Sequence, residues 1–480
     1  MIDTGAIRIK AVSMAVLGEL TVDYISNSKA DEDFRNMKIV PKRIDSEEIP
    51  FELKADWQWV RMADLGADEK NSFADGPFGS NLKREHYTTE KQVRIIQLSN
   101  IGDLGWKDDN EKYTTYEHLE TIKRSEVQPG NIVIAKMMPA GRAIIVPDIS
   151  SKFVLSSDCI KFVPNSGLNV KYLCYAINSQ LFRKQVLQGV HGIGRERTSL
   201  SKIKTFLLPI PPVDEQKEIA NKLDAIFDLL NIIDALQSQY RNNLDALKSK
   251  IMDAGIRGKL TEQLPTDGTA EELYAQIQEE KARLVKEGKI KKEKPLPAIE
   301  ADEIPFEIPK NWKWVRWGNV INIVSARRVH QSDWRNKGVP FYRAREIARL
   351  ADEGSVNNDL FISEELYNEF SKSGVPKSGD LMVTGVGTLG KTYVVRDNDR
   401  FYYKDASVLC FENIAGLNPP YLKLLMDSSL TRSQIGNNSG GTTVDTLTMV
   451  RMNRYIFPLP PLAEQKRITE KIDEVLRVIQ

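Results

Sequence analysis

The chain has 480 residues, enough for about three domains, and its 41% hydrophobic and 28% charged content is typical of globular cores with well-solvated surfaces. The formal net charge is only +1, which excludes a protein that binds nucleic acid through a global basic field. A local basic cleft is compatible with this balance, because binding depends on where the charges lie.

Cysteine usage and hydropathy predict a soluble cytoplasmic protein. Cys159, Cys174 and Cys410 are widely spaced and form neither a metal-ligand pattern nor a disulfide framework, which indicates a reducing compartment. The first residues, "MIDTGAIRIKAVSMAVLGEL", lack the long apolar region and the cleavage site of a signal peptide. No segment approaches the ~18 apolar residues of a membrane span. We therefore expect no metal, no cofactor and no membrane partner.

Residues 1–47 are predicted to be a helical segment related to a later part of the chain. "KAVSMAVLGELT" at Lys10–Thr21 aligns with "KIMDAGIRGKLT" at Lys250–Thr261, and the two share Lys, Gly, Leu and Thr. We interpret Met1–Arg43 as the far end of a second helical region that stands at the front of the chain. This arrangement predicts a pseudo-twofold, nearly circular molecule whose termini meet at one end.

Two tandem repeats follow, at residues 48–212 and 301–461. "EIPFELKADWQWVR" recurs as "EIPFEIPKNWKWVR" 255 positions later, and from Gly130 onward the offset is 249. Strand-like "NIVIA", "AIIVP" and "CIKFVP" lie among turns and a few helices. We predict two globular α/β domains and an α+β fold class. The aromatic residues that keep one spacing in both copies indicate scaffold rather than base-stacking platforms: Trp57, Trp59, Trp312 and Trp314.

Each repeat ends in a similar phrase, "PIPPVDEQKEIANKLD" from Pro209 and "PLPPLAEQKRITEKID" from Pro458. Pro-Pro before Glu-Gln-Lys is typical of a helix start. Apolar residues then recur at steps of four and three, as in a coiled-coil seam that only Gln237 interrupts. The predicted seam comprises Ile219, Leu223, Ile226, Leu230, Ile233, Tyr240, Leu244, Leu247, Ile251, Ile468, Ile472, Val475 and Ile479.

The length of this helix separates two interpretations. At ~1.5 Å per residue, the stretch from Glu215 to about Ile256 would span roughly 60 Å. A domain of this size does not need such a helix, so the length favours an antiparallel coiled coil over a helix packed on its own domain. Residues 213–300 are assigned to the central helical region and its linker, and residues 462–480 to the start of a distal helix. The linker has a turn at Pro265–Gly268, a charged helix and a Lys/Pro-rich exit, a composition typical of a solvated connector.

Two short motifs resemble enzyme signatures. "GVGTLGKT" (Gly385–Thr392) fits a phosphate-binding pattern, but that mechanism needs a helix after the glycines, and strand-like "YVVRD" follows. We expect a glycine hairpin that presents a basic residue to an acidic partner, Lys391 here and Arg142 in the first repeat. "NPPY" (Asn418–Tyr421) matches a tetrapeptide of adenine-N-methyltransferases, but its counterpart is "NVKY", so it predicts a helix start with Pro. Neither repeat offers a coherent nucleophile, metal cluster or carboxylate pair.

Two variable repeats, each closed by "P-[IL]-P-P-x-x-E-Q-K" and a long helix, resemble the specificity subunit of type I restriction–modification systems. "GPFGSNLK" at Gly76–Lys83 and "GTLGKTYVV" at Gly387–Val395 are also similar to phrases of this family. The resemblance covers essentially the whole chain. It implies that each domain reads one half of a split sequence in double-stranded DNA and that the helices fix the spacing and dock two methyltransferase subunits. It also implies that restriction/motor subunits can join the complex and that the specificity subunit catalyses nothing.

Candidate DNA contacts are polar or basic residues in loops between the scaffold landmarks, since Arg and Asn read base edges and Lys and Arg bind phosphates. They are Asn81, Lys83, Arg84, Arg142, Arg195 and Arg197 in the first repeat, and Arg327, Arg328, Arg343, Arg345, Lys391, Thr442 and Thr443 in the second. Two alternatives stay open: a coiled-coil protein scaffold without DNA readout, and an NTPase that uses Gly385–Thr392.

Overall fold

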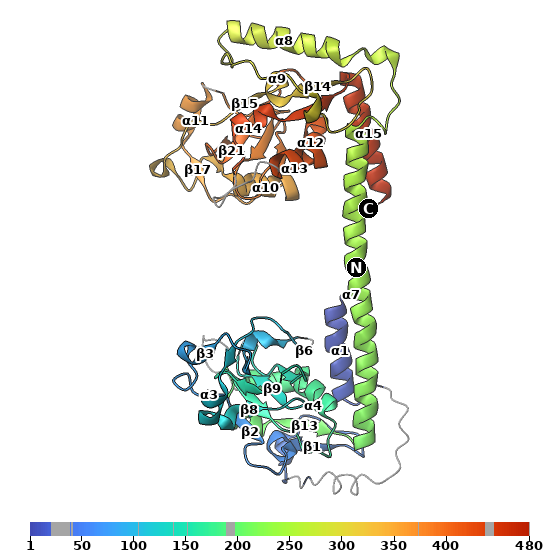
Figure 1. Cartoon of the computed structure of the whole chain (residues 1–480), viewed down its shortest axis with the longest axis vertical. Coiled ribbons are helices and arrows are strands. Elements are labelled where there is room, and N and C mark those ends of the chain that lie inside the picture. Colours follow the sequence, from blue (N-terminus) through green and yellow to red (C-terminus); the bar gives the residue numbers. More distant parts are fainter. Residues whose placement is uncertain are drawn as a thin grey trace. The chain divides into compact units, whose positions relative to one another are not determined.

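A computed structural model describes residues 1–20, 39, 42–103, 105–137, 139–150, 152–188, 197–372, 374–436 and 446–479. The chain divides into two compact units, Met1–Gln239 and Tyr240–Gln480 (Figure 1). The boundary falls inside helix α7 (Val213–Ile256), so each unit is described by itself. None of the helices in these ranges is long and apolar enough to cross a membrane.

The first unit is an α+β domain built around two sheets. Its antiparallel sheet has the order β10 (Ala143–Ile145), β9 (Ile132–Ala135), β12 (Cys159–Phe162) and β2 (Phe73–Asp75). Its mixed sheet has the order β3 (Tyr87–Thr88), β7 (Tyr113–Thr114), β4 (Val93–Ile96), β11 (Phe153–Leu155) and β8 (Glu126–Val127), with β4 and β11 parallel. The strands predicted from "NIVIA", "AIIVP" and "CIKFVP" are β9, β10 and β12, so these predictions are confirmed.

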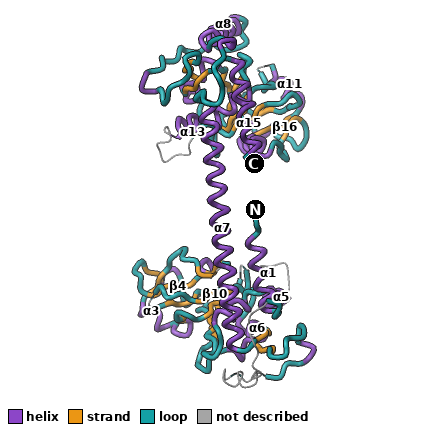
Figure 2. The backbone as a smooth tube through the Cα atoms, turned by 90° about the vertical axis from the view of Figure 1, so that its right-hand side faces the viewer, coloured by secondary structure: helices purple, strands orange, loops and turns teal. Residues whose placement is uncertain are grey.

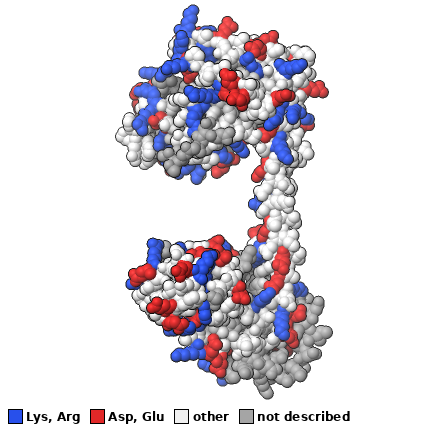
Figure 3. Space-filling model, in the orientation of Figure 1, with Lys and Arg blue, Asp and Glu red and all other residues white. Residues whose placement is uncertain are grey.

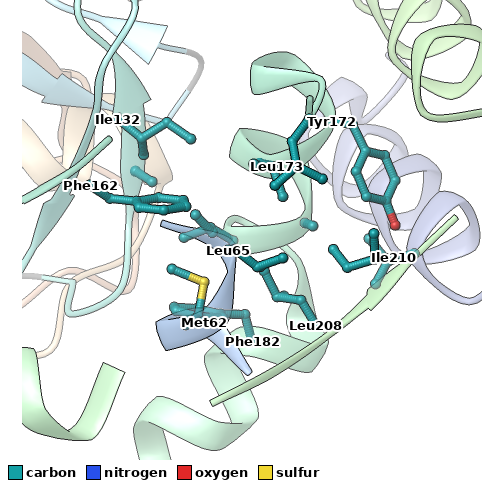
Figure 4. Close-up of a cluster of buried hydrophobic side chains, with 14 of the residues drawn as sticks. Met62, Leu65, Ile132, Phe162, Tyr172, Leu173, Phe182, Leu208 and Ile210 are labelled. Atoms are coloured by element: carbon teal, nitrogen blue, oxygen red, sulfur yellow. The ribbon is translucent and has the colours of Figure 1, made fainter. Parts of the chain in front are cut away.

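Smaller elements complete the first unit. Strand β1 (Gln58–Arg61) pairs with β13 (Leu207–Ile210), and β5 (Ile101–Gly102) with β6 (Gly105–Trp106). The helices besides α7 are α1 (Thr4–Val16), α3 (Tyr116–Thr121), α4 (Val170–Ile177), α5 (Gln180–Gln188) and α6 (Leu200–Thr205). Figure 4 shows how Met62, Leu65, Phe162, Phe182 and Leu208 meet in its core, which is closed to solvent at each of these five residues.

The second unit repeats this architecture. Its antiparallel sheet has the order β15 (Asn322–Val324), β21 (Val408–Glu412), β18 (Leu381–Thr384) and β19 (Thr392–Val394). This is the order β10-β9-β12-β2 of the first unit read from its other end. A second sheet joins β17 (Phe361–Ile362), β16 (Val339–Tyr342) and β20 (Tyr402–Tyr403), and β14 (Lys313–Arg316) pairs with β22 (Ile456–Leu459). Its helices are α8 (Ala270–Lys286), α9 (Trp317–Val320), α10 (Ala344–Glu353), α11 (Glu364–Ser371), α12 (Pro419–Asp427), α13 (Ser429–Gly436), α14 (Met449–Arg454) and α15 (Leu462–Val478).

The glutamate of the repeated Glu-Gln-Lys phrase ties the exit helix to the start of each repeat. The indole Nε1 of Trp57 donates to Glu215 at 2.9 Å, and the indole of Trp312 donates to Glu464 at 2.8 Å. Both carboxylates are buried, so each indole supplies a hydrogen bond to a charge that is shielded from water. Trp312 also donates to Gln263 at 3.1 Å. The prediction that these tryptophans are scaffold aromatics is confirmed.

The glutamine of the same phrase ties the exit helix to the residue that caps α4 in the first unit and α12 in the second. The side-chain oxygen of Gln216 accepts from the amide of Asn169 at 2.9 Å, and its nitrogen donates to the carbonyl of Pro211 at 2.8 Å. Gln465 makes the same two bonds, with Asn418 at 3.1 Å and Pro460 at 3.0 Å. The phrase therefore recurs because it closes each domain.

Helix α1 belongs to the core of the first unit, although a whole repeat separates it from α7 in sequence. Thr4 Oγ1 donates to Asp234 at 2.5 Å, and Arg8 donates to Asn231 and Asp234 at 2.9 Å. The numbering rises along α1 as it falls along α7, so the helices are antiparallel, and they lie side by side in Figures 1 and 2. Ala15 on α1 is buried in the same cluster as Ile219.

The second unit holds an equivalent helix pair. There α15 packs against the last turns of α7, with Ile468 and Ile472 in one cluster with Ile256. A Cβ on Gly255 would lie 2.8 Å from Cδ1 of Ile472, so a larger residue at this position would push the ends of the isoleucine side chains of α15 aside. The first unit thus uses residues 4–16 where the second uses the end of α7, as the alignment of Lys10–Thr21 with Lys250–Thr261 suggests.

The predicted seam residues fall into three environments. Ile219, Leu223, Leu230, Ile468 and Ile472 are buried, and all but Leu230 lie in the two domain cores, as the single-domain interpretation expects. The half-buried seam residues are Ile226, Ile233, Leu244, Ile251, Val475 and Ile479. Tyr240 and Leu247, in the middle of α7, are exposed. A continuous coiled-coil seam stays a prediction for this middle segment.

The linker differs from the solvated connector that its composition predicts. Helix α8 packs on α9, where Gln278 and Lys281 donate to the carbonyls of Asn319 and Gly318 at 2.8 and 2.6 Å. Ile277 is 2% exposed and lies in the core of the second unit. The charges that suggested a free connector line the outer face of α8, while its apolar face is buried.

Candidate nucleic-acid interface

In the first unit, the "GPFGSNLK" loop is held against a neighbouring turn at Ser156. The amide of Gly76 donates to the carbonyl of Cys159 at 2.9 Å, and a Cβ at position 76 would lie 1.8 Å from the Ser156 carbonyl oxygen. Only glycine allows this approach of the two backbones. The loop then displays Asn81, Lys83 and Arg84 as exposed side chains.

Two stacked histidines support the base of this loop. The rings of His86 and His118 lie 4.1 Å apart. The backbone amide of Lys83 donates to Nδ1 of His86 at 3.1 Å, while Nε2 of His118 lies 2.8 Å from the carbonyl of Asn81. His86 and His118 thus each contact the backbone of the loop, at Lys83 and at Asn81.

Arg197 lies beside the same turn. Its guanidinium is 3.5 Å from Asp158, and both side chains are partly exposed. Beneath them, Lys136 is 9% exposed, donates to the carbonyl of Ser157 at 2.9 Å and pairs with Asp75 at 2.6 Å. Lys136 was not predicted, because only Arg142, six residues later, corresponds to the basic residue of the glycine-rich motif, Lys391. Arg195 lies outside the described residues.

A cavity of about 370 Å³ opens between these loops. Its polar lining residues are Tyr87, Gln97, Ser99, Ser156, Ser157 and Asp158. None of these six was predicted from the sequence, because no motif distinguishes them. The structure brings the loops of Asn81, Lys83, Arg84 and Arg197 to the surroundings of this cavity.

Arg142 lies elsewhere in the first unit, on the turn between β9 and β10. Its guanidinium pairs with Asp103 and donates to the carbonyl of Ile101 at 3.3 Å. It lines a separate cavity of about 710 Å³ together with Arg8 and Arg183. Arg142 therefore does not lie at the cavity that Gln97 lines.

In the second unit, Arg327 and Arg328 are exposed next to the turn that follows β20. The guanidinium of Arg327 lies 4.3 Å from the Phe370 ring centroid and 3.3 Å from Glu369. Arg328 is 3.7 Å from Asp405. This basic residue beside an acidic turn resembles Arg197 beside Asp158.

Arg343 and Arg345 share two carboxylates. Both donate to buried Glu346, at 2.9 and 2.8 Å, and both approach Asp359, at 3.3 and 3.2 Å. Burial alone would raise the pKa of Glu346, but the hydrogen bonds from the two arginines outweigh it and lower the pKa to about 2. The carboxylate thus stays charged at neutral pH and fixes both guanidinium groups.

The glycine-rich motif of the second unit is a hairpin. Strand β18 ends at Thr384 and β19 begins at Thr392, and the two pair antiparallel, so no helix N-terminus follows the glycines to hold a phosphate. Lys391 donates to Asp352. The predicted glycine hairpin is confirmed here and at Arg142. In both hairpins the basic residue contacts an acid of the same unit, and a separate acidic partner stays a prediction. Thr442 and Thr443 lie outside the described residues.

"NPPY" is a helix start, as predicted. The side chain of Asn418 accepts from the amide of Tyr421 at 2.9 Å and caps α12, whose first residue is Pro419. The hydroxyl of Tyr421 donates to the carbonyl of Pro458 at 2.8 Å inside the core. This geometry leaves no opening where the tetrapeptide could grip a base.

Neither the charges on the face drawn in Figure 3 nor metal-ligand chemistry in the described ranges marks a further site. On the face drawn in Figure 3, Lys and Arg side chains are interspersed with Asp and Glu on both units. Within the described ranges, no group of three or more His, Cys, Asp or Glu residues could hold a metal ion. Burial raises the pKa of the Cys159 and Cys174 thiols to about 12, which makes both poor nucleophiles at neutral pH.

The repeats and their closing helices define the class of protein. Residues 56–239 and 309–480 match the family model of the type I restriction modification DNA specificity domain. These two segments make up more than half of the chain, and the chain therefore belongs to this family.

Curated relatives agree with this assignment, and one solved structure shares the fold. The EcoAI specificity subunit of a type I restriction enzyme from Escherichia coli is 27% identical, over 92% of this chain and 81% of that protein. The EcoEI specificity subunit from the same species is 24% identical, over 91% and 80%. A chain from a structural study of assembly and conformational transition in the type I R-M system shares the fold with a TM-score of 0.60, at 16% identity over 90% of this chain and 92% of that one.

Proposed function

We propose that this chain is the DNA sequence-recognition subunit of a type I restriction–modification methyltransferase/endonuclease complex, and that each unit reads one half of a bipartite target. The observation that carries the proposal is the match of both repeats to the DNA specificity domain. In support, each unit places a basic side chain beside an acidic turn, Arg197 at Asp158 and Arg328 at Asp405.

Within such a complex this subunit recognises DNA and leaves the reaction to its partners. Lys83, Arg84 and Arg197 would bind phosphates of the first half-site and supply salt-dependent affinity. Two methyltransferase subunits would bind to the specificity subunit, and restriction/motor subunits would join them in the cytoplasm. Helix α7 would set the spacing of the half-sites, about one DNA turn of ~34 Å.

The exposed face of α7 supports the docking role. Five exposed apolar side chains follow one another at steps of three, four, four and seven residues: Leu229, Ile232, Leu236, Tyr240 and Leu247. Single exposed apolar residues are ordinary, but a helical stripe of this length is typical of a surface that another helix covers. We assign it to the methyltransferase subunits.

The proposal is tested on the full chain purified with its own methyltransferase subunits. We expect sequence-dependent binding to duplex DNA that weakens steeply with salt, and single-molecule sequencing of the host genome should find a split, asymmetric methylated motif. Binding without sequence preference or salt dependence would support a protein scaffold instead.

Exchange of residues 48–212 for the first repeat of another family member tests whether each unit reads its own half of the target. Because the first unit holds its own core, the exchange should change one half of the methylated motif and leave the other half intact. Altered recognition in both halves would contradict two independent readers.

A further inference from the structure

The cavity beside Gln97 has the properties of a base-reading site. Its polar wall is formed by side chains that accept and donate hydrogen bonds, and exposed Lys83, Arg84 and Arg197 stand on the loops around it. Such a combination places donors and acceptors where base edges could reach them while the basic residues hold the phosphates. The inference rests on the proposed function.

The backbone of Gln97 is fixed by a hydrogen bond, while its side-chain amide can still bind a ligand. Its N–H donates to Oδ1 of Asn100 at 2.9 Å, which fixes the residue at the start of the 3-10 turn Leu98–Asn100. Its side-chain oxygen accepts from Asn110 at 3.4 Å, a long bond that water or DNA can replace. Its side-chain nitrogen donates to no residue that the structure describes. An amide with a free donor and a weakly used acceptor matches N7 and N6 of adenine.

The wall of the cavity at Ser156 and Ser157 is held in place by hydrogen bonds. The amide of Ser156 donates to the carbonyl of Ile96 at 2.8 Å, the residue just before Gln97. Buried Lys136 ties the carbonyl of Ser157 to the acid of the neighbouring strand, Asp75. A reader needs this support, because a side chain that moves by an ångström loses its hydrogen-bond geometry.

The second unit places Arg343 at the equivalent position. There the amide of Lys404 donates to the carbonyl of Tyr342 at 2.8 Å, so Tyr342 corresponds to Ile96 and Arg343 to Gln97. Like Gln97, Arg343 stands at the start of the segment after the strand, and its N–H donates to the residue three positions later, Glu346, at 2.9 Å. Glu346 and Asp359 orient its guanidinium, the fork that binds O6 and N7 of guanine.

We propose that Gln97 and Arg343 are paired specificity-determining residues, Gln97 reading an adenine in the first half-site and Arg343 a guanine in the second. The common backbone position explains why the scaffold is shared, and the different side chains explain how the two halves of the target differ.

Reciprocal substitutions test this assignment in the complete complex. Gln97→Arg should change one adenine of the first half of the methylated motif to guanine, and Arg343→Gln should change one guanine of the second half to adenine, with the spacer unchanged. The matched controls are Gln128→Arg and Arg349→Gln, exposed residues of the same units outside both positions. They should leave the motif as it is.

If a variant complex methylates DNA poorly, its base preference can be measured by competition between DNA duplexes for binding. With the purified complex, replacing the assigned adenine should weaken wild-type binding about tenfold or more, and the isosteric variant Gln97→Glu should lose this preference. The competing duplexes carry A, G, C or T at the assigned position. An unchanged motif and unchanged competition in the Gln97 variants would overturn the inference. An equal loss of affinity for all four duplexes by a folded Gln97→Glu complex would also overturn it. Failure of the wild-type complex to show any split motif would instead count against the proposed function.

Discussion

Asp103 and Asp352 pair with the basic residue of each hairpin, Arg142 and Lys391. If the hairpins bind DNA as proposed, each carboxylate competes with a DNA phosphate for its cation. Such partly exposed pairs contribute little to stability, about 0–1 kcal/mol. Their equivalent placement suggests that they tune how strongly the hairpins attract DNA.

We therefore expect Asp103→Asn to strengthen DNA binding by the complex at low salt. Freed from its carboxylate, Arg142 would neutralise one more phosphate, so the slope of log affinity against log salt should steepen by about 0.9. Filter binding across a salt series measures both quantities. Asp109→Asn changes the net charge equally at an exposed position of the same unit, and equal effects of the two variants would show that Asp103 acts only through net charge.

Glu346 gives the second unit a pH dependence of known sign. Because its folded pKa of about 2 lies below the unfolded value of about 4.3, the charged carboxylate stabilises the unit above about pH 4.3, and this contribution is lost as the pH falls toward 2. Glu346→Gln should lower the free energy of unfolding by about 2 kcal/mol at pH 7.

Urea denaturation at pH 7, 4 and 3 measures this difference, which should shrink as the pH falls. Glu353→Gln changes an exposed residue of the same helix and should have no effect beyond about 0.5 kcal/mol. A gap between wild type and Glu346→Gln that stays constant down to pH 3 would contradict the proposed role of the charged carboxylate.

At the scale of elements, the sequence was most informative where repetition doubled the signal. The two Glu-Gln-Lys phrases, the paired Trp motifs and the strands β9, β10 and β12 are all found as predicted. The polar cavity could not be predicted, because Gln97 and Ser156 meet through the parallel pairing of β4 with β11, which no local pattern encodes. Helix α8 was misread since its apolar face has only a few residues among many charges.

Ile277 tests whether α8 is part of the second unit. Ile277→Ala should lower the free energy of unfolding by about 2–4 kcal/mol, because it removes buried methyl groups and leaves a cavity under the helix. Chemical denaturation of the full chain measures the loss. Glu279→Ala, on the exposed face two residues away, should change stability by less than about 0.5 kcal/mol. Equal, small effects of both variants on the free energy of unfolding would support the interpretation of α8 as a solvated connector.

At the scale of the molecule, each unit is assembled from the same parts in a different chain order. The first takes its second helix from residues 4–16, and the second takes it from the end of α7. Helix α7 therefore contributes its first turns to one core and its last turns to the other. A single helix shared in this way is the element that could set a distance between two DNA readers.

A seven-residue insertion after Leu244 tests α7 as this spacer. Seven helical residues add about 10 Å and nearly two full turns, so the heptad pattern continues in phase while the helix lengthens. About three base pairs of DNA span the same length, but they turn the second half-site far less than a full turn around the DNA axis. The two units can therefore bind both half-sites only if the number of base pairs between them changes. We expect a changed spacer in the methylated motif or loss of methylation. Seven Gly/Ser residues inserted after Lys291, in the exposed exit of the linker, should leave the gap intact. An unchanged gap with the lengthened α7 would rule out the helix as the spacer.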